Sequence, residues 1–243
     1  MRIIDEPIFP AESANNCTAK SVETDQDNHL WLKFWRDQRS DFHQSAVNPL
    51  LSKFWSSLEL IRGSRVFVPL CGKSLDMIWL AQQGHEVIGV ELSPVAVEDF
   101  FRENGLQPTQ RQLGTFTLWS DGKLGILCGD YFALTKAVLG QFDTVYDRSA
   151  LTALPESIRS QYVAQLRRLV PDTARVFLLT VEDAAEDATM QQANGVDEEI
   201  KTLYSAGFEI DLAYVESIFE TAPDAPELPA IRAEYKVYRL SAK

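Results

Sequence analysis

Two acidic residues stand where apolar runs of the chain end, and their spacing points to nucleoside chemistry. Glu91 closes the run VIGVE, 19 residues after Gly72, and Asp130 follows the run KLGILCG. A carboxylate at the end of the second strand of a βαβ unit accepts hydrogen bonds from both hydroxyls of a ribose. The carboxylate after the next strand is placed to accept from the exocyclic amine of an adenine. The pattern predicts a site for an adenine nucleoside.

Each of these acids also has a structural interpretation, which the sequence leaves open. Glu91 lies two residues before Ser93, at the start of a predicted helix, so it is alternatively a capping residue. Asp130 precedes Tyr131 and is alternatively the first residue of a turn.

The turn before the predicted helix limits the kind of nucleoside. Residues 69–74 read PLCGKS and contain a single glycine, Gly72, whereas the dinucleotide motif GxGxxG has three. No glycine lies five residues before Gly72, so the turn is not a Walker A loop either. Small residues at such a turn let backbone N–H groups approach a ligand closely. A single-glycine turn with acids after two strands favours S-adenosylmethionine over NAD.

The elements that must position these residues alternate along the chain. Residues 66–93 predict strand, turn, amphipathic helix and strand, and further strands and helices follow to the C-terminus. Such alternation is typical of an α/β fold, a Rossmann-like doubly wound, mostly parallel sheet. We expect seven strands, with an antiparallel strand at the C-terminal edge, as in class I methyltransferases. Asp121-Gly122 between alternating runs predicts a hairpin.

The N-terminal part predicts an arm and a lid. Residues 1–28 show no helical or strand period, and we interpret them as an arm that is flexible or packs irregularly. Residues 29–243 form one predicted domain, whose first part, 29–62, is helical. Trp31 and Trp35 are four residues apart and so share one helical face. They either anchor this helix to the core or form an aromatic lid over a flat ligand.

Composition excludes several classes of function. The 243-residue chain has a net charge of −12 and a pI of about 4.7, which disfavours nucleic acids and anionic membranes as partners. No apolar run approaches a membrane span. The three cysteines, Cys17, Cys71 and Cys128, form neither a disulfide framework nor a CxxC metal motif, so no metal site is predicted. We expect a cytoplasmic, monomeric protein that acts on a small molecule.

The motifs around these residues resemble the bacterial thiopurine S-methyltransferase family. The similarity runs through WLKFWRDQRSDFHQSAVNPLL, VFVPLCGKSLDMIWLAQQGHEVIGVELS, LCGDYFAL, YDRSALTALP and EYKVYRL. It covers residues 29–180 and the last strand, and the combination of PLCGKSxD, GVELS and YDRxALxAL is specific. The resemblance implies a class I fold that binds S-adenosylmethionine and methylates thiols, yielding S-adenosylhomocysteine.

The resemblance also implies which residues form the site. Arg232 corresponds to a substrate-side arginine, and His43 neighbours the covering segment. The implied cofactor contacts and covering residues are Trp35, Leu70, Gly72, Glu91 and Arg148, with Asp130 and Tyr131 near the adenine, and Trp31 and Phe42 above.

The chemistry asks for alignment more than for covalent catalysis. A methyl sulfonium is already activated, and an in-line attack needs only a well-placed nucleophile. A thiol attacks as its thiolate, which cationic Arg148 or Arg232 would favour. His43 is a candidate base, although a single loop histidine is more often structural. Arg148 alternatively forms a surface ion pair with Asp147 or a neighbouring residue.

The acceptor is predicted to differ from a thiopurine. The family has a tyrosine-rich segment near residues 182–199, whereas this chain has seven acids and no aromatic residue there. We expect another small thiol as the acceptor. The alternatives are a methyltransferase for selenium, tellurium or arsenic species, a halide or a hydroxyl, and a non-catalytic S-adenosylmethionine-binding protein.

Overall fold

The computed structural model describes residues 22–39, 43–183, 195–220 and 231–243. Their contacts divide the chain into two units. The first unit takes the chain up to Ala46 together with Arg65–Phe142, and the second takes Val47–Ser64 together with Asp143–Lys243.

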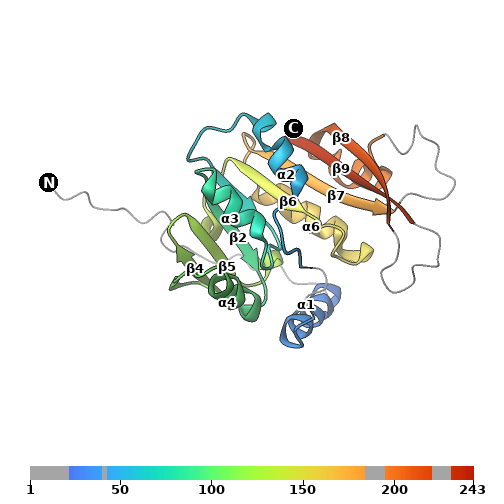
Figure 1. Ribbon diagram of the computed structural model, residues 1–243. Helices are drawn as coiled ribbons and strands as arrows, with labels where there is room; N and C mark the ends of the chain where they lie inside the picture. The colour runs from blue at the N-terminus through green and yellow to red at the C-terminus, as the bar shows by residue number, and fades with distance from the viewer. Residues whose placement is uncertain (1–21, 40–42, 184–194, 221–230) are drawn as a thin grey trace. The chain divides into compact units, whose positions relative to one another are not determined.

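The first unit holds five strands in the order β3-β4-β5-β2-β1. Strands β1, β2 and β5 run parallel, and β3, β4 and β5 form an antiparallel meander. Helices α3 and α4 pack on β2 and β5 (Figure 1). The elements are α1 (Val22–Arg36), β1 (Arg65–Val68), α3 (Leu75–Gln82), β2 (Glu86–Glu91), α4 (Pro94–Glu103), β3 (Thr109–Leu113), β4 (Phe116–Asp121), β5 (Leu124–Cys128), the 3₁₀ turn η2 (Tyr131–Ala133) and α5 (Lys136–Leu139).

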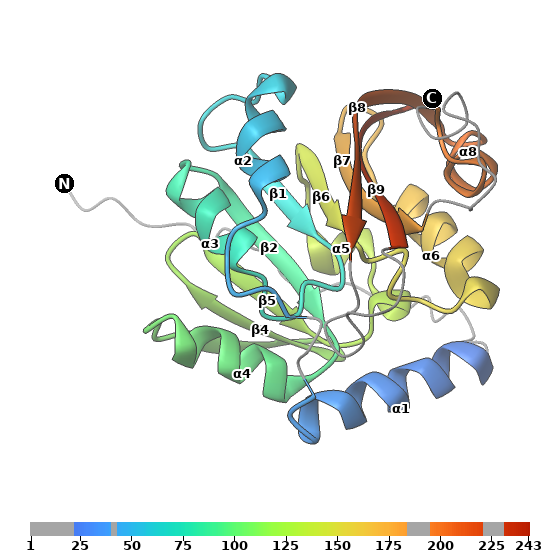
Figure 2. The same cartoon turned by 45° about the vertical axis from the view of Figure 1, so that its right-hand side comes forward.

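The second unit holds four strands in the order β6-β7-β9-β8. Strands β6 and β7 are parallel, whereas β9 runs antiparallel to both of its neighbours. Helix α8 packs against α6 and β8 (Figure 2). The elements are α2 (Pro49–Phe54), the 3₁₀ turn η1 (Trp55–Leu58), β6 (Thr144–Arg148), α6 (Glu156–Leu169), β7 (Arg175–Asp183), α8 (Glu198–Tyr204), β8 (Phe208–Glu220) and β9 (Ile231–Ala242).

Capping and turn residues end helices and strands at positions that the sequence predicts. Ser93 caps α4 by accepting a hydrogen bond from the Ala96 N–H. At the far end, Asn104 caps α4 and Gly105 has φ +67°. The Gly122-containing turn joins β4 to β5 as an antiparallel hairpin. The α/β class, the parallel strands and the antiparallel C-terminal strand are all confirmed.

Two features differ from the predictions. The described residues contain nine strands rather than seven, among them β3, which precedes the predicted hairpin, and β8, which pairs with β9 at the edge of the sheet. Helix α1 begins at Val22, before the predicted start at His29, so residues 22–28 extend that helix. The prediction of an arm over the rest of 1–28 lies outside the described residues.

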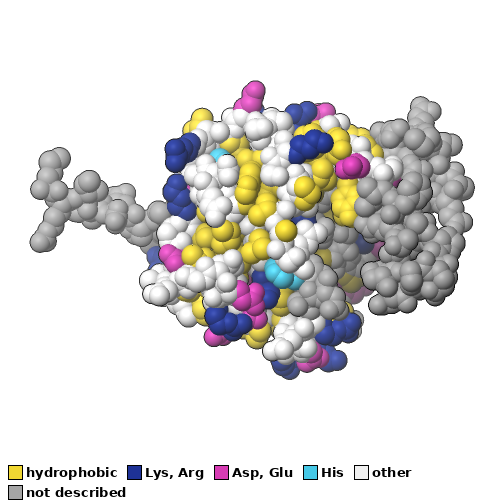
Figure 3. Space-filling model, viewed as in Figure 1, with side chains coloured by type: hydrophobic (Ala, Val, Ile, Leu, Met, Phe, Trp, Pro, Cys, Tyr) yellow, Lys and Arg dark blue, Asp and Glu magenta, His cyan; other side chains and the backbone are white. Residues whose placement is uncertain are grey.

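The surface carries both signs of charge. Lys and Arg side chains are scattered in small groups on the face shown in Figure 3 and do not form a continuous basic patch there. Within the described ranges, no helix combines the length and the apolar character that a membrane crossing requires.

The contact between Gly89 and the turn after β1 generates the first prediction. A Cβ on Gly89 would lie 2.5 Å from the Cys71 Sγ atom and 3.0 Å from the Met77 Cε atom. Both partners are buried, so Gly89→Ala is expected to lower the free energy of unfolding by roughly 2 kcal/mol through overpacking. Urea unfolding measures this loss. Gly207→Ala is the control, since its Cβ would meet only the flexible, partly exposed side chain of Arg167, which can move aside. An equal loss in both variants would contradict the packing argument.

Candidate active site

The carboxylate of Glu91 joins the ends of two neighbouring strands. Its Oε2 atom accepts a hydrogen bond from the Gly72 N–H at 3.0 Å, and its Oε1 atom accepts from the Ser93 N–H at 2.7 Å. Because β1, β2 and β5 are parallel, their carboxyl ends lie at one edge of the sheet, and Glu91 stands there beside Cys128 of β5. A carboxylate can accept about four hydrogen bonds, so this one retains capacity for a further donor. The arrangement suits a pair of vicinal hydroxyls.

Burial changes the acid–base behaviour of Glu91. Its side chain is only 6% exposed, and the loss of hydration raises the pKa of this carboxyl to about 7. The backbone donors of Ser93, Gly72 and Leu92 act in the opposite direction, since they stabilise the anion. Around neutral pH, Glu91 therefore changes its charge easily when a ligand supplies further donors.

The turn between β1 and α3 is held in an unusual backbone conformation. Leu70 has φ +46°, a left-handed value that costs a non-glycine residue free energy, and Gly72 has φ +51°. A Cβ on Gly72 would lie 3.3 Å from the Trp35 indole, so the ring covers this glycine closely. Glycine is required at position 72 for both reasons.

The face of α1 that carries Trp31 and Trp35 also carries buried polar residues. Thr24 and Asp27 are buried, and Trp35 is 5% exposed. The Trp31 indole donates a hydrogen bond to the Asp27 carboxylate, which lowers its pKa, but burial outweighs this effect and the pKa is raised. Trp35 therefore anchors α1, as the first interpretation predicts, while Trp31 is half-buried.

Asp130 caps the turn that follows β5 and also holds α1. Its Oδ1 atom accepts a hydrogen bond from the Phe132 N–H at 2.9 Å, and its Oδ2 atom accepts from the Asn28 side-chain amide at 3.1 Å. The structural interpretation of Asp130 is thus confirmed, and a role toward an adenine stays a prediction. Tyr131 is a core side chain, 2% exposed, whereas the neighbouring Phe132 ring is half-buried.

In the second unit, Asp147 serves the loop after β6 and does not pair with Arg148. Tyr162 donates its hydroxyl to the Asp147 Oδ2 atom at 2.6 Å, and the Ala150 N–H donates to Oδ1 at 3.3 Å. Asp147 is fully buried, which raises the pKa of its carboxyl to about 6. The alternative of a surface ion pair between Arg148 and Asp147 is therefore wrong, because Asp147 is buried and successive side chains of a strand point to opposite faces. A pair between Arg148 and another neighbour stays a prediction.

The remaining predicted residues are less closely defined. Arg148 is half-buried at the end of β6, and His43 is half-buried in the segment that precedes α2. Arg232 pairs with Phe219 in the β8–β9 ladder, and its side chain lies outside the described part of the chain, as does Phe42. The roles of all four residues stay predictions.

The two cysteines near Glu91 are poor nucleophiles. Burial raises the pKa of Cys71 well above its usual range, and burial together with the Glu91 charge raises the pKa of Cys128 to about 11. Both side chains are therefore thiols at neutral pH. Neither cysteine is therefore assigned a role as a nucleophile.

Sequence reasoning missed Asn28 and Lys73. Asn28 lies on the helical face of Thr24, Asp27, Trp31 and Trp35, at spacings of three and four residues, but that face is polar and gave no hydrophobic signal. Lys73 belongs to the PLCGKS turn, which the sequence excludes as a Walker A loop, and no other role is predicted for it. Its position next to the single glycine of the turn was the available clue.

Comparison with known proteins identifies the family. The family model described as thiopurine S-methyltransferase matches residues 26–243. The chain belongs to the thiopurine S-methyltransferase family. The match extends beyond the predicted range of 29–180 and the last strand, and it includes the segment 182–199.

Individual relatives agree with the family and the fold. A thiopurine S-methyltransferase of Stutzerimonas stutzeri is 66% identical over 220 residues, which cover 90% of this chain and 93% of the relative. The Bordetella petrii protein of the same name is 43% identical, covering 88% and 98%. Two solved structures share the fold: a SAM-dependent methyltransferase from Anabaena variabilis (TM-score 0.59, 14% identity, covering 89% and 95%) and the Burkholderia thailandensis 1,6-didemethyltoxoflavin-N1-methyltransferase with bound S-adenosylhomocysteine (TM-score 0.57, 16% identity, covering 96% and 94%).

This family member is an S-adenosylmethionine-dependent S-methyltransferase. The residues present fit the cofactor's adenosyl part. The Glu91 oxygens are aimed by two backbone donors and retain acceptor capacity, and Gly72 leaves the turn without a side chain beside them. No anion-binding set of glycines is present for a pyrophosphate, which S-adenosylmethionine lacks.

The raised pKa of Glu91 predicts how stability depends on pH. Between about pH 4.5 and 7 the folded protein holds a proton on Glu91 that the unfolded chain has lost, so stability falls as pH rises through this window. The expected contribution is on the order of 3 kcal/mol. Urea unfolding of the ligand-free protein from pH 4.5 to 8 measures it.

The Glu91→Gln variant separates the pH-dependent contribution of Glu91 to stability from the contributions of other titrating groups. It should show a smaller fall across the same window, and the slope that remains belongs largely to Asp147, whose pKa is also raised. An unchanged slope in Glu91→Gln would contradict the assignment.

Proposed function

We propose that this enzyme transfers the methyl group of S-adenosylmethionine to a small-molecule thiol other than a thiopurine. The observation that carries the cofactor half of the proposal is the buried Glu91 carboxylate, oriented by the Gly72 and Ser93 N–H groups at the carboxyl ends of β1 and β2. The ribose 2′- and 3′-hydroxyls would donate to its two oxygens. Trp31, Trp35, Leu70, Asp130 and Tyr131 would surround the rest of the adenosyl group.

The proposed step is an in-line displacement. The acceptor sulfur forms a bond to the methyl carbon as the bond from that carbon to the sulfonium sulfur breaks. The electron pair of the broken bond stays on the departing sulfur, which becomes the neutral thioether of S-adenosylhomocysteine. The acceptor loses its thiol proton to water, and a positive charge from Arg148 or Arg232 would favour the thiolate. Both arginines keep their own protons at neutral pH.

The identity of the acceptor rests on the segment 182–199. Its sequence, EDAAEDATMQQANGVDEE, has no aromatic side chain that could stack on a purine. Its seven acids also disfavour an anionic acceptor through like-charge repulsion. A small, neutral thiol fits this composition better than a thiopurine does.

We also propose that the enzyme works as a monomer in the cytoplasm. Among the described cysteines, Cys71 and Cys128 are free thiols, as expected for a protein in a reducing compartment.

A methyl-transfer screen tests the function. S-adenosylhomocysteine formation is measured with aliphatic thiols, aromatic thiols, thiopurines, hydrosulfide, selenols, tellurite, arsenite and halides. The highest kcat/KM is expected for a small thiol that is not a thiopurine. A thiopurine as the best acceptor would overturn the acceptor assignment. Binding of S-adenosylhomocysteine without turnover of any acceptor would favour the non-catalytic alternative.

Replacement of Glu91 tests the cofactor site directly. Glu91→Ala removes two charge-assisted hydrogen bonds, so the affinity for S-adenosylhomocysteine should fall on the order of 100-fold or more, as measured by calorimetry. Glu86→Ala is the matched control, since Glu86 is the first residue of the same strand, at its opposite end. Retained affinity in Glu91→Ala would sink the proposed site.

The pH dependence of binding should have the opposite sign to that of stability. Ribose hydroxyls donate to the ionised carboxylate, so a protonated Glu91 must lose its proton on binding. With a pKa of about 7, affinity should rise roughly 30-fold from pH 5.5 to a plateau above pH 8. Calorimetry in buffers of different ionisation enthalpy should show proton release near pH 6. A cofactor analogue without the 2′-hydroxyl is the control, because its pH dependence should be weaker.

A further inference from the structure

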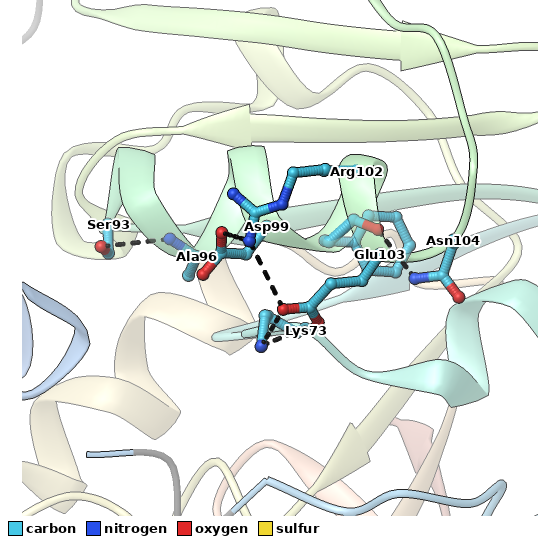
Figure 4. Close-up of polar contacts among 8 residues, drawn as sticks. Lys73, Ser93, Ala96, Asp99, Arg102, Glu103 and Asn104 are labelled. Carbon is cyan, nitrogen blue, oxygen red and sulfur yellow. Dashed lines mark hydrogen bonds and ion pairs between the residues drawn. The ribbon is translucent and has the colours of Figure 1, made fainter. Parts of the chain in front are cut away.

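Lys73 lies directly after the glycine of the turn, and its side chain connects three elements of the first unit. The ammonium lies 2.8 Å from both carboxylate oxygens of Glu103, the last residue of α4. It also stands 5.9 Å from the centre of the Trp35 ring of α1. Figure 4 shows Lys73 reaching from its turn to the acidic side chain on α4.

This contact differs from an ordinary surface ion pair. The Lys73 side chain is 10% exposed, whereas that of Glu103 is 43% exposed, so the cation is nearly withdrawn from water. A partly buried pair is screened less by solvent than an exposed one. The bidentate contact fixes the end of a flexible side chain in one place.

Two other charged residues of α4, Asp99 and Arg102, lie near Glu103. Arg102 pairs with Asp99 one helical turn earlier and lies 3.7 Å from the Glu103 Oε1 atom. An acid at a helix C-terminus is unfavourable with the helix dipole, and the cations of Lys73 and Arg102 offset this cost. Figure 4 shows these residues along one side of α4, with the Ser93 cap at its start.

Lys73 and Glu91 hold the same turn through different contacts. The Gly72 N–H is held by Glu91, the Trp35 ring covers Gly72, and the Lys73 side chain contacts both α4 and that ring. The cation over the Trp35 face adds an attraction that holds the indole in place. Trp35 and Gly72 are thus fixed relative to each other before a ligand arrives, which reduces the entropy cost of binding.

We propose that Lys73 is a positioning residue for S-adenosylmethionine, which acts by holding Trp35 and the Gly72 turn in their cofactor-binding arrangement. This inference rests on the proposed placement of the adenosyl group at Glu91. It assigns Lys73 no contact with the reacting atoms, so its loss should weaken cofactor binding and spare the methyl-transfer step.

The kinetics of Lys73→Met test this role. The KM for S-adenosylmethionine and the Kd for S-adenosylhomocysteine should each rise about 10-fold. The value of kcat at saturating cofactor and the KM for the acceptor should stay within about 2-fold of the parent, since uniform binding energy has been removed. Lys73→Arg should restore most of the affinity, because a guanidinium reaches a carboxylate and stacks on an indole.

The control is Lys123→Met. Lys123 donates to the Gly84 carbonyl at 2.8 Å, next to the amino-terminal end of β5 and so away from the carboxyl ends. Its replacement removes a comparable side-chain contact and should leave the cofactor KM unchanged. If Lys73→Met behaves as Lys123→Met does, or if it lowers kcat as much as it raises KM, the positioning role is overturned.

A double-mutant cycle with Glu103→Gln identifies the path of the effect. If Lys73 acts through Glu103, the double variant should lose no more affinity than Lys73→Met alone. Independent, additive losses would overturn the part assigned to Glu103. The proposed function would instead be overturned if the parent enzyme failed to bind S-adenosylhomocysteine or if Glu91→Ala retained that binding. If Glu91→Ala loses binding and Lys73→Met shows no change, only the positioning role of Lys73 is overturned.

Discussion

The first unit depends on a carboxylate that is kept out of water. Glu91 ends the strand β2, and its two oxygens accept the N–H groups of Gly72 and Ser93. Two segments that leave neighbouring parallel strands are thereby tied to one side chain. A buried charge is costly unless it is paired with donors. Here the backbone donors offset that cost only in part, so the pKa of Glu91 is raised to about 7.

The cost of burying the Glu91 charge is only partly offset, and this matters for ligand binding. A fully satisfied carboxylate would be more stable but would offer little to a ligand. Because the Glu91 carboxylate retains acceptor capacity, the vicinal hydroxyls of a ribose would complete its hydrogen bonds. On the proposed binding mode, the free-energy cost of burying Glu91 in the ligand-free protein would be offset by the hydrogen bonds that the cofactor donates. Strain at Leu70, which has a left-handed φ, belongs to the same turn.

Helix α1 shows a related use of polar groups. Its buried face carries Thr24, Asp27 and Asn28 beside the tryptophans. Such a face gains less from the hydrophobic effect than an apolar one would. The helix is instead held by particular contacts: Asn28 with Asp130, Trp35 with Gly72, and the Lys73 ammonium over the Trp35 ring. Each of these contacts ends at a residue of the predicted cofactor edge. Docking of α1 and order at that edge are therefore coupled.

The sequence by itself determined what depends on neighbours in the chain. The strand–turn–helix–strand over residues 66–93, the caps at Ser93 and Asn104, and the hairpin at Gly122 follow from local backbone preferences and periodicity. The spacing of Gly72 and Glu91 predicted that both residues lie where neighbouring strands end, and the structure joins them there by a hydrogen bond. Only the tertiary structure decided which partners meet from afar. It joined Lys73 to Glu103 and Asn28 to Asp130, and it gave the Asp147 carboxylate to Tyr162 instead of Arg148. Such polar pairs leave no periodic signal, because they depend on how the elements pack rather than on the spacing of residues along any one of them.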